Sequence, residues 1–216
     1  MNRRWILASL LLWSLSAGAA TLEQIIERNK HVLDGVTDFT AIMTFTVRSA
    51  DMRVPPSRVK IYFKKPDKFK PEPLDGDFAV LPNTYHLAIG NVLERLLKGN
   101  KAALVRQETL NNRAQYLIKI TPKTSDSPLS YHLVYVDTER FTVTRVVTTP
   151  KHDQPATLKM SYEAHGKAWL PSEASIDGYH KTKDKDGQLV NQAVQVKLTF
   201  AKYRVNVGLS DKLFDS

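Results

Sequence analysis

The chain has 216 residues, with 31 lysine and arginine residues against 22 aspartate and glutamate residues, and it contains no cysteine. The absence of cysteine excludes a disulfide framework and thiol chemistry, so a hydrophobic core must supply the stability. The formal net charge is +9 at pH 7, so the protein is basic and is not a strongly acidic chain.

The first twenty residues have the pattern of a secretory signal peptide. Residues 2–4 carry two arginines, residues 5–15 are an apolar or small-residue run, and residues 16–20 are small. The run is too short to span a bilayer, which takes ~20 apolar residues. We predict export by the general secretory route, cleavage after Ala19 or Ala20, and a periplasmic location in a bacterium.

The remaining residues, 21–216, suit one domain, large enough to bury roughly 70% of the surface of its unfolded chain. Loss of Arg3 and Arg4 with the signal lowers the net charge from +9 to +7. For an exported protein, this charge favours anionic membrane surfaces or acidic partners over nucleic acid. A basic surface that serves only solubility is the alternative.

An amphipathic helix is predicted at residues 21–33. Glu23 stands in the first turn, where a negative charge complements the helix dipole, and Gly35 is placed for a left-handed C-cap. The residues that predict its buried face recur close to every third or fourth position, namely Leu22, Ile25, Ile26, Asn29, Val32 and Leu33. We expect this helix to pack on a sheet.

From Phe39 the apolar period changes to two, which is typical of strands with one buried face. Asp186 and Gly187 form the strongest hairpin signal. Strands are predicted at residues 39–48, 59–64, 78–81, 103–108, 115–121, 131–136, 142–149, 157–163, 169–177 and 193–205. Consecutive strands of this kind favour an antiparallel sheet with one covered face.

A second helix is predicted at residues 87–98, with Leu93, Leu96 and Leu97 on one face and Gly99 as a stop. Gly90 weakens its start. The fold class is therefore α+β: one domain in which a long curved antiparallel sheet carries two helices against one face.

No catalytic or metal-binding pattern is present in the sequence. There is no H-x-x-x-H pair, G-x-S-x-G elbow, P-loop or G-x-G-x-x-G segment. The histidines are scattered singly at His31, His86, His132, His152, His165 and His180. We predict that the protein is not an enzyme and needs no metal or cofactor, although a spatially assembled catalytic group would escape a sequence pattern.

Three local features together resemble one protein family. Residues 36–41 read VTDFTA directly after the first helix, residues 64–70 read KKPDKFK at a strand end, and residues 203–214 read YRVNVGLSDKLF. The chain resembles the periplasmic lipoprotein carrier and lipoprotein-sorting superfamily, the LolA-like proteins, over almost all of residues 21–216. The segment from Lys65 to Phe69 is the sharpest of these motifs.

The resemblance implies an open, incomplete and curved antiparallel β-barrel with helices covering its concave face as a lid. It also implies an apolar cavity between sheet and lid that receives acyl chains. The candidates for lining that cavity are Met43, Phe45, Ile61, Phe63, Leu93, Leu97, Met160 and Tyr162. The alternative is that these side chains form a filled core.

Lys65 is the candidate for the gate of the lid. In the best-known carriers the residue before this proline is an arginine that hydrogen-bonds the lid backbone, and lysine lacks the planar guanidinium fork. A solvated charge at a strand end is the alternative for Lys65. Pro66 ends strand pairing, and Pro71 and Pro73 predict a semi-rigid loop or a sheet edge.

The resemblance predicts a soluble, monomeric periplasmic carrier that holds the acyl chains of a lipoprotein or lipid for delivery towards the outer membrane. Its partners would be an inner-membrane donor and an outer-membrane acceptor. The alternative is an envelope-stress or regulatory module of the same fold that binds a membrane-anchored anti-sigma protein. Such regulators carry a second domain, for which we expect no room after Phe214.

Overall fold

The computed structural model describes residues 20–50, 53–75 and 89–215. The predicted signal peptide, apart from Ala20, and the predicted strand at residues 78–81 lie outside this part of the chain. The first helix is confirmed as α1 (Leu22–Lys30), which continues into the 3₁₀ turn η1 (His31–Leu33). Thr21 and Gln24 form a reciprocal capping box at its start.

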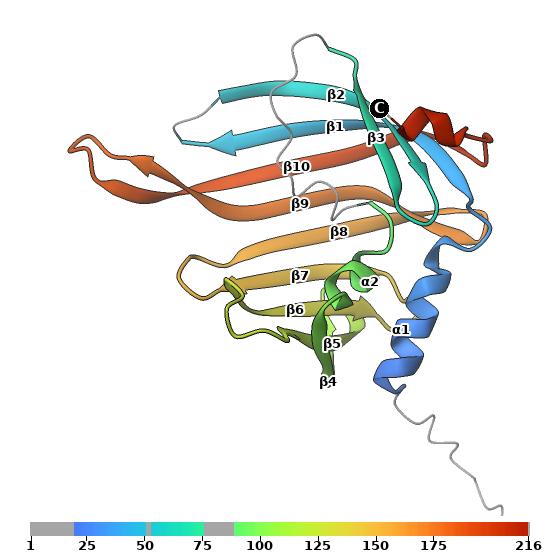
Figure 1. Cartoon of the computed structure of the whole chain (residues 1–216), viewed down its shortest axis with the longest axis horizontal. Coiled ribbons are helices and arrows are strands. Elements are labelled where there is room, and N and C mark those ends of the chain that lie inside the picture. The colour runs from blue at the N-terminus through green and yellow to red at the C-terminus, as the bar shows by residue number, and fades with distance from the viewer. Residues whose placement is uncertain (1–19, 51–52, 76–88, 216) are drawn as a thin grey trace, which may run out of the picture.

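Ten antiparallel strands form one curved sheet (Figure 1). Their order across the sheet is β3-β2-β1-β10-β9-β8-β7-β6-β5-β4. The strands are β1 (Asp38–Ser49), β2 (Arg53–Lys64), β3 (Lys68–Pro73), β4 (Asn100–Leu110), β5 (Arg113–Pro122), β6 (Leu129–Asp137), β7 (Val143–Pro150), β8 (Ala156–His165), β9 (Ala168–Lys183) and β10 (Leu189–Val205). Each predicted strand in the described residues overlaps one of them. The edge strands β3 and β4 do not pair with each other, so the sheet is an open barrel.

The first and last strands of the described residues lie side by side inside the sheet, because β1 pairs with β10. Every other pair in the sheet joins two strands that are consecutive in the sequence. The register of β1 against β10 shifts between Thr40 and Ile42, opposite a residue, Lys202, whose φ is 56°. The β8–β9 register shifts again at Tyr162. Such bulges bend strands and increase twist, which accounts for the curvature of the sheet.

Pro71 and Pro73 lie in β3, at one edge of the sheet. The predicted loop or edge is therefore an edge strand. β3 pairs only with β2, where Ile61 stands opposite Pro71 and Val59 opposite Pro73. Proline lacks the N–H that an inner strand would need for two neighbours, so an edge is the position that tolerates it.

The second helix is shorter than the sequence predicted. α2 spans Val92–Leu97, and the Asn91 side chain caps it by accepting from the Glu94 backbone N–H at 3.1 Å. Gly90 has a φ of +79°, a left-handed conformation that cannot continue a right-handed helix. The helix α2 therefore begins after Gly90, and residues 87 and 88 of the predicted helix lie outside the described residues.

One buried core contains side chains from both helices and from the sheet. α1 contributes Ile25, and α2 contributes Val92, Leu93 and Leu96. The two helices also contact each other and lie side by side in Figure 1. Helices this short are marginal in isolation, so these tertiary contacts hold them in place.

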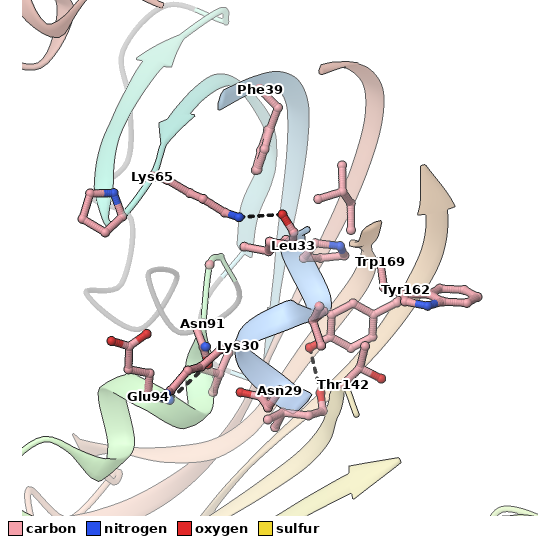
Figure 2. Close-up of a pocket in the computed structure, with 17 residues that line it drawn as sticks. Asn29, Lys30, Leu33, Phe39, Lys65, Asn91, Glu94, Thr142, Tyr162 and Trp169 are labelled. Carbon is pink, nitrogen blue, oxygen red and sulfur yellow. Dashed lines mark hydrogen bonds between the residues drawn. The ribbon is translucent and has the colours of Figure 1, made fainter. Parts of the chain in front are cut away.

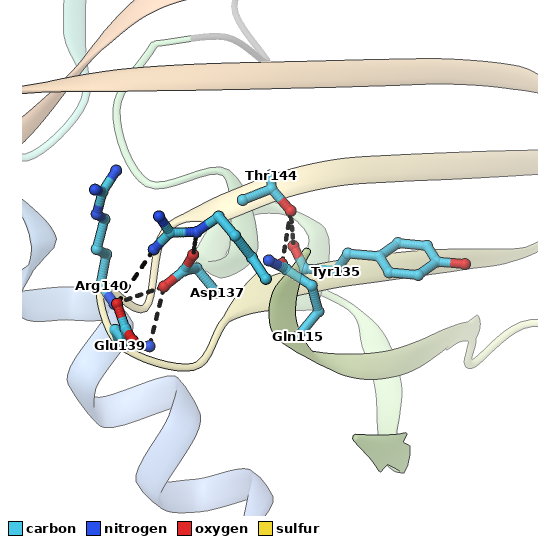
Figure 3. A network of polar contacts seen from close by, with 7 residues as sticks. Gln115, Tyr135, Asp137, Glu139, Arg140 and Thr144 are labelled. Atoms are coloured by element: carbon cyan, nitrogen blue, oxygen red, sulfur yellow. Dashed lines mark hydrogen bonds and ion pairs between the residues drawn. The ribbon is translucent and has the colours of Figure 1, made fainter. Parts of the chain in front are cut away.

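The turn between β6 and β7 ties α1 to the sheet. Within it, the buried Asp137 carboxylate accepts hydrogen bonds from Arg113 Nε at 2.6 Å and from the backbone N–H groups of Glu139 and Arg140 at 3.0 and 2.9 Å (Figure 3). Asn29 Nδ2 of α1 donates to the Phe141 carbonyl oxygen at 2.6 Å. The conformation of this turn therefore sets the position of the helix.

We expect the Asp137 network to make the stability of the protein depend on acidic pH. Burial raises the pKa of the Asp137 carboxyl, but the bonds from Arg113, Arg140 and Glu139 outweigh burial and hold that pKa below its ordinary 3.8. A depressed carboxyl pKa gives stability that is present above the unfolded-state value and is lost as the pH falls through the folded-state value. Asp137→Asn should therefore lower the free energy of unfolding by about 1–2 kcal/mol at pH 7.

Urea unfolding of wild type and Asp137→Asn between pH 7 and pH 3 measures this effect. The difference between the two proteins should narrow below about pH 4, because the Asp137 carboxyl of the unfolded chain binds a proton first and the folded carboxyl follows only at its lower pKa. Glu139→Gln is the matched control, because its side chain is 81% exposed and lies 3.4 Å from Arg113. A difference that stays constant down to pH 3 would contradict this account.

Candidate functional site

A pocket of about 240 Å³ lies where the helices meet the sheet (Figure 2). The end of α1 with η1 forms one wall, and residues 90–94 at the start of α2 form a second. The turn between β2 and β3 contributes Lys65 and Pro66, and residues at or next to β1, β7, β8 and β9 supply the remaining walls. The pocket therefore lies at the junction of the helical and sheet layers.

Apolar and aromatic groups dominate the pocket walls. Phe39 at the start of β1 is 1% exposed; its ring stacks on Phe63 with centroids 5.0 Å apart and meets Tyr203 edge-on at 5.3 Å. Trp169 and Leu170 of β9 also line the pocket. Such a surface favours apolar ligand groups over charged ones.

Tyr162 brings a polar group to the pocket without making it reactive. Its hydroxyl donates to the Val143 carbonyl oxygen at 2.8 Å. Burial raises the pKa of the Tyr162 hydroxyl well above its ordinary value. The hydroxyl is therefore neutral at physiological pH, and its proton is engaged in a structural hydrogen bond.

Lys65 connects the β2–β3 turn to the helical layer. Its Nζ donates to the Leu33 carbonyl oxygen at 2.6 Å (Figure 2). Its backbone N–H donates to the Thr37 carbonyl oxygen at 2.9 Å. A side-chain cation on the backbone of the helical segment is the kind of contact that the resemblance implies at this position. The role of Lys65 in opening stays a prediction.

The predicted cavity residues lie in three different places. Tyr162 lines the pocket. Leu97 is half-buried against the core, and Met160 lines a separate pocket of about 530 Å³ whose walls are mostly polar and charged. The other five are at most 2% exposed and pack in the core, namely Met43, Phe45, Ile61, Phe63 and Leu93. That these residues bind a ligand stays a prediction.

The sequence pattern missed most of the pocket walls. Phe39 was placed in a family motif but not in the cavity, and Leu33 was assigned only to the buried face of the helix. Trp169 and Pro171 are also wall residues that were not predicted. A pattern in the sequence could have identified Trp169. It is a large aromatic residue shortly after the turn at Gly166, and a strand begins there, at the rim of the sheet.

Within the described part of the chain, no three His, Asp or Glu side chains are grouped closely enough to hold a metal ion. Neither helix there has the length and apolar character that crossing a bilayer requires. His132 is buried, which lowers its pKa, and its Nδ1 lies 2.9 Å from the Thr148 hydroxyl. Its surroundings are those of a structural histidine.

Several solved structures share this architecture. One is described as an outer membrane lipoprotein-sorting protein domain from Vibrio parahaemolyticus, with a TM-score of 0.64 at 12% identity over 88% of this chain and 94% of that one. A LolA superfamily protein from Nitrosomonas europaea gives 0.58 at 13% identity, over 91% and 98%. A DUF1329 family protein from Desulfovibrio piger gives 0.62 at 14% identity, again over 91% and 98%.

No protein-family model matches the sequence, and no curated protein matches it significantly. The structural similarities span almost the full length of both chains in each comparison. The protein therefore has a LolA-like fold, as the sequence resemblance implied. At identities of 12–14% the similarity establishes the fold alone, because one fold can carry several functions.

Proposed function

We propose that the protein is a periplasmic carrier that holds the acyl chains of a lipoprotein or lipid for delivery towards the outer membrane. The observation that carries this proposal is the apolar pocket between helices and sheet, on a LolA-like fold. The signal-peptide pattern of residues 1–20 supports export. The mature chain would act without covalent chemistry and without a cofactor.

In this proposal the helices cover the concave face as a lid and move to admit the ligand. The pocket of about 240 Å³ is smaller than the ~300–1,000 Å³ typical of ligand sites, so acyl chains need more room. Displacing α1 and α2 would uncover core side chains next to the pocket, such as Phe63, and would expose the Leu93 side chain that α2 carries. The predicted cavity would then form around the present pocket.

The energetics of acyl binding suit such a lid. Burying each CH₂ of an acyl chain contributes about 0.8 kcal/mol, so two or three chains offset the cost of ordering the ligand and moving two short helices. The same burial makes unassisted loss of the chains to water unfavourable. An acceptor at the outer membrane would therefore be needed for release.

Native mass spectrometry with an acylated peptide tests the carrier proposal. Mature protein beginning at Ala20 or Thr21 is incubated with a triacylated lipopeptide and, as the control, with the same peptide lacking its acyl chains. We expect a complex with the lipopeptide alone. Protein that stays bare with both peptides contradicts the proposal and favours the regulatory alternative.

Lys65→Met should make the lid open more easily. The variant removes the bond from Lys65 Nζ to the Leu33 carbonyl oxygen, and a bond from a charged donor contributes about 1.5 kcal/mol. We expect uptake and release of a fluorescent acyl probe to become about tenfold faster, measured by stopped flow.

Lys68→Met is the matched control for this experiment. It removes the same charge from the first residue of β3, directly after the same turn, but Lys68 pairs with the exposed Asp211 at 3.0 Å. Exchange rates in the control should stay close to those of wild type. Equal rates in Lys65→Met and wild type would show that this hydrogen bond does not hold the lid.

A further inference from the structure

Arg95 of α2 is a half-buried cation with no carboxylate partner among the described residues. One guanidinium nitrogen, Nη2, donates to the Ile89 carbonyl oxygen in the segment before the helix. The Nε–H group is buried and has no hydrogen-bond partner, and no carboxylate of the described residues forms an ion pair with Arg95. By contrast, Arg113 donates to the Asp137 carboxylate at 2.6 Å.

Such an arrangement is unfavourable in the absence of a ligand. Removing an ion from water costs several kcal/mol even after relaxation, and a partner normally compensates for that cost. Burial lowers the pKa of Arg95, while Asp67 and Glu94 act on it only from a distance and in the opposite direction. Unpaired N–H groups inside a protein therefore call for an explanation.

The guanidinium lies directly behind one wall of the pocket. Gly90 forms part of that wall, and a methyl group built on Gly90 would come within 3.9 Å of Arg95 Nη1 and 3.3 Å of Phe63 Cε2. Tyr162, another wall residue, is close enough for its hydroxyl and Arg95 to influence each other electrostatically. A small shift of residues 89–95 would bring the guanidinium to the pocket surface.

We propose that Arg95 binds the anionic group of the carried ligand, so that the ligand class is an anionic amphiphile. The proposal rests on the carrier function proposed above. The guanidinium fork matches the two oxygens of a phosphate or carboxylate, and its unpaired Nε–H is free for a bidentate contact. Binding exchanges the bond to the Ile89 carbonyl oxygen for a charged acceptor.

The acidic residues near Arg95 do not occupy the position that the ligand anion would take. Glu94 is exposed on α2, and Asp67 is exposed in the β2–β3 turn. Lys65, on the same pocket rim, adds a second positive charge whose Nζ is 2.6 Å from the Leu33 carbonyl oxygen. Opening of the lid would free both cations for the same headgroup.

Binding of matched single-chain probes to Arg95 variants tests this inference. Dodecyl phosphate and dodecanoate are the anionic probes, dodecyl maltoside is the uncharged probe with the same chain, and inorganic phosphate is the free anion. Wild type should bind the anionic probes at least tenfold more tightly than the maltoside. Arg95→Met should lose that preference while it keeps its affinity for the maltoside.

Two further variants separate recognition from folding. Arg95→Lys keeps the charge without the fork and should retain part of the preference, while the thermal midpoint of Arg95→Met should stay equal or rise. Arg140→Met is the control, because its guanidinium lies 4.1 Å from the Trp169 ring centroid, beside the same pocket. Its preference should remain that of wild type.

The other possible binding results each contradict a different part of the proposal. Equal affinity of wild type for charged and uncharged probes, or an unchanged preference in Arg95→Met, overturns the inference and leaves the carrier function intact. Inorganic phosphate that binds as tightly as dodecyl phosphate overturns the assignment to an amphiphile. If all three dodecyl probes fail to bind wild type while the triacylated lipopeptide still binds, the inference about Arg95 is overturned and the carrier function stands. If the lipopeptide fails to bind as well, the carrier proposal itself is overturned.

Discussion

Replacing Phe39 with alanine is expected to lower the free energy of unfolding by about 3–5 kcal/mol, the usual cost of removing a buried aromatic ring. The Phe39 ring is 1% exposed and packs between Phe63 and Tyr203 with centroid distances of 5.0 and 5.3 Å. The loss combines transfer of the ring to water with the cavity it leaves. Because Phe39 also lines the pocket, the vacated volume adds to the existing 240 Å³.

Equilibrium unfolding in guanidinium chloride measures the loss of unfolding free energy in Phe39→Ala, with Tyr179→Ala as the control. Tyr179 is also an aromatic residue on the sheet but is 51% exposed, so its removal should change the free energy by less than about 0.5 kcal/mol. A cost below about 1 kcal/mol for Phe39→Ala would mean that the neighbouring rings collapse into the space. In that case Phe39 does not hold the pocket open.

The amino-acid pattern predicted the first helix and the strands of the antiparallel sheet well, because burial of a single face imposes a clear period. α1 followed from apolar positions in residues 21–33, and β1 followed from the alternation after Phe39. Pro71 and Pro73 predicted a loop or a sheet edge, since a missing N–H is a local property, and the structure shows the edge. Gly187, with a φ of 80°, lies in the predicted hairpin turn.

The depth of a side chain within a layer could not be predicted in the same way. Alternation places Met43 and Phe45 on the inner face, but only the curvature of the whole sheet determines that both are buried there. The pocket instead forms near the bulge at Tyr162, where the register of β8 and β9 shifts. A bulge depends on both strands and leaves little trace in the sequence of either.

Contacts between layers were equally hidden from the sequence. Lys65 was a candidate because of the resemblance, whereas its acceptor, the Leu33 carbonyl oxygen, is a backbone atom whose position depends on η1. Arg95 carried no signal, because one arginine on a short helix usually faces solvent. Its unpaired Nε–H becomes informative only in the packed structure.

Asp38→Ala is expected to lower the free energy of unfolding by about 2–4 kcal/mol, because it leaves several backbone N–H groups without an acceptor. The Asp38 carboxylate is buried and accepts from the backbone N–H groups of Val207, Gly208 and Leu209 at distances of 2.8 to 3.3 Å. It therefore holds the segment that follows β10 against the start of β1. That segment then continues into η3 (Asp211–Phe214), which contacts β3.

Urea unfolding and amide hydrogen exchange together test the role of Asp38. Faster exchange at residues 207–209 should accompany the loss of stability, since those amides lose their acceptor. Asp211→Ala is the control: its side chain is 62% exposed and pairs with Lys64 and Lys68 at the surface, so it should cost less than about 1 kcal/mol. Equal costs for the two variants would contradict the role of the buried carboxylate.

The position of Asp38 connects this stability effect to the proposed function. Asp38 is adjacent to Phe39 of the pocket wall and to Thr37, whose carbonyl oxygen accepts from the Lys65 backbone N–H at 2.9 Å. Asn206 strengthens the same junction by donating to the Gly35 carbonyl oxygen at 2.7 Å. In a carrier, one side of the pocket must stay fixed while the helices move, and the hydrogen bonds of this junction hold that side in place. Acyl-probe affinity in Asp38→Ala should therefore fall even where the variant remains folded.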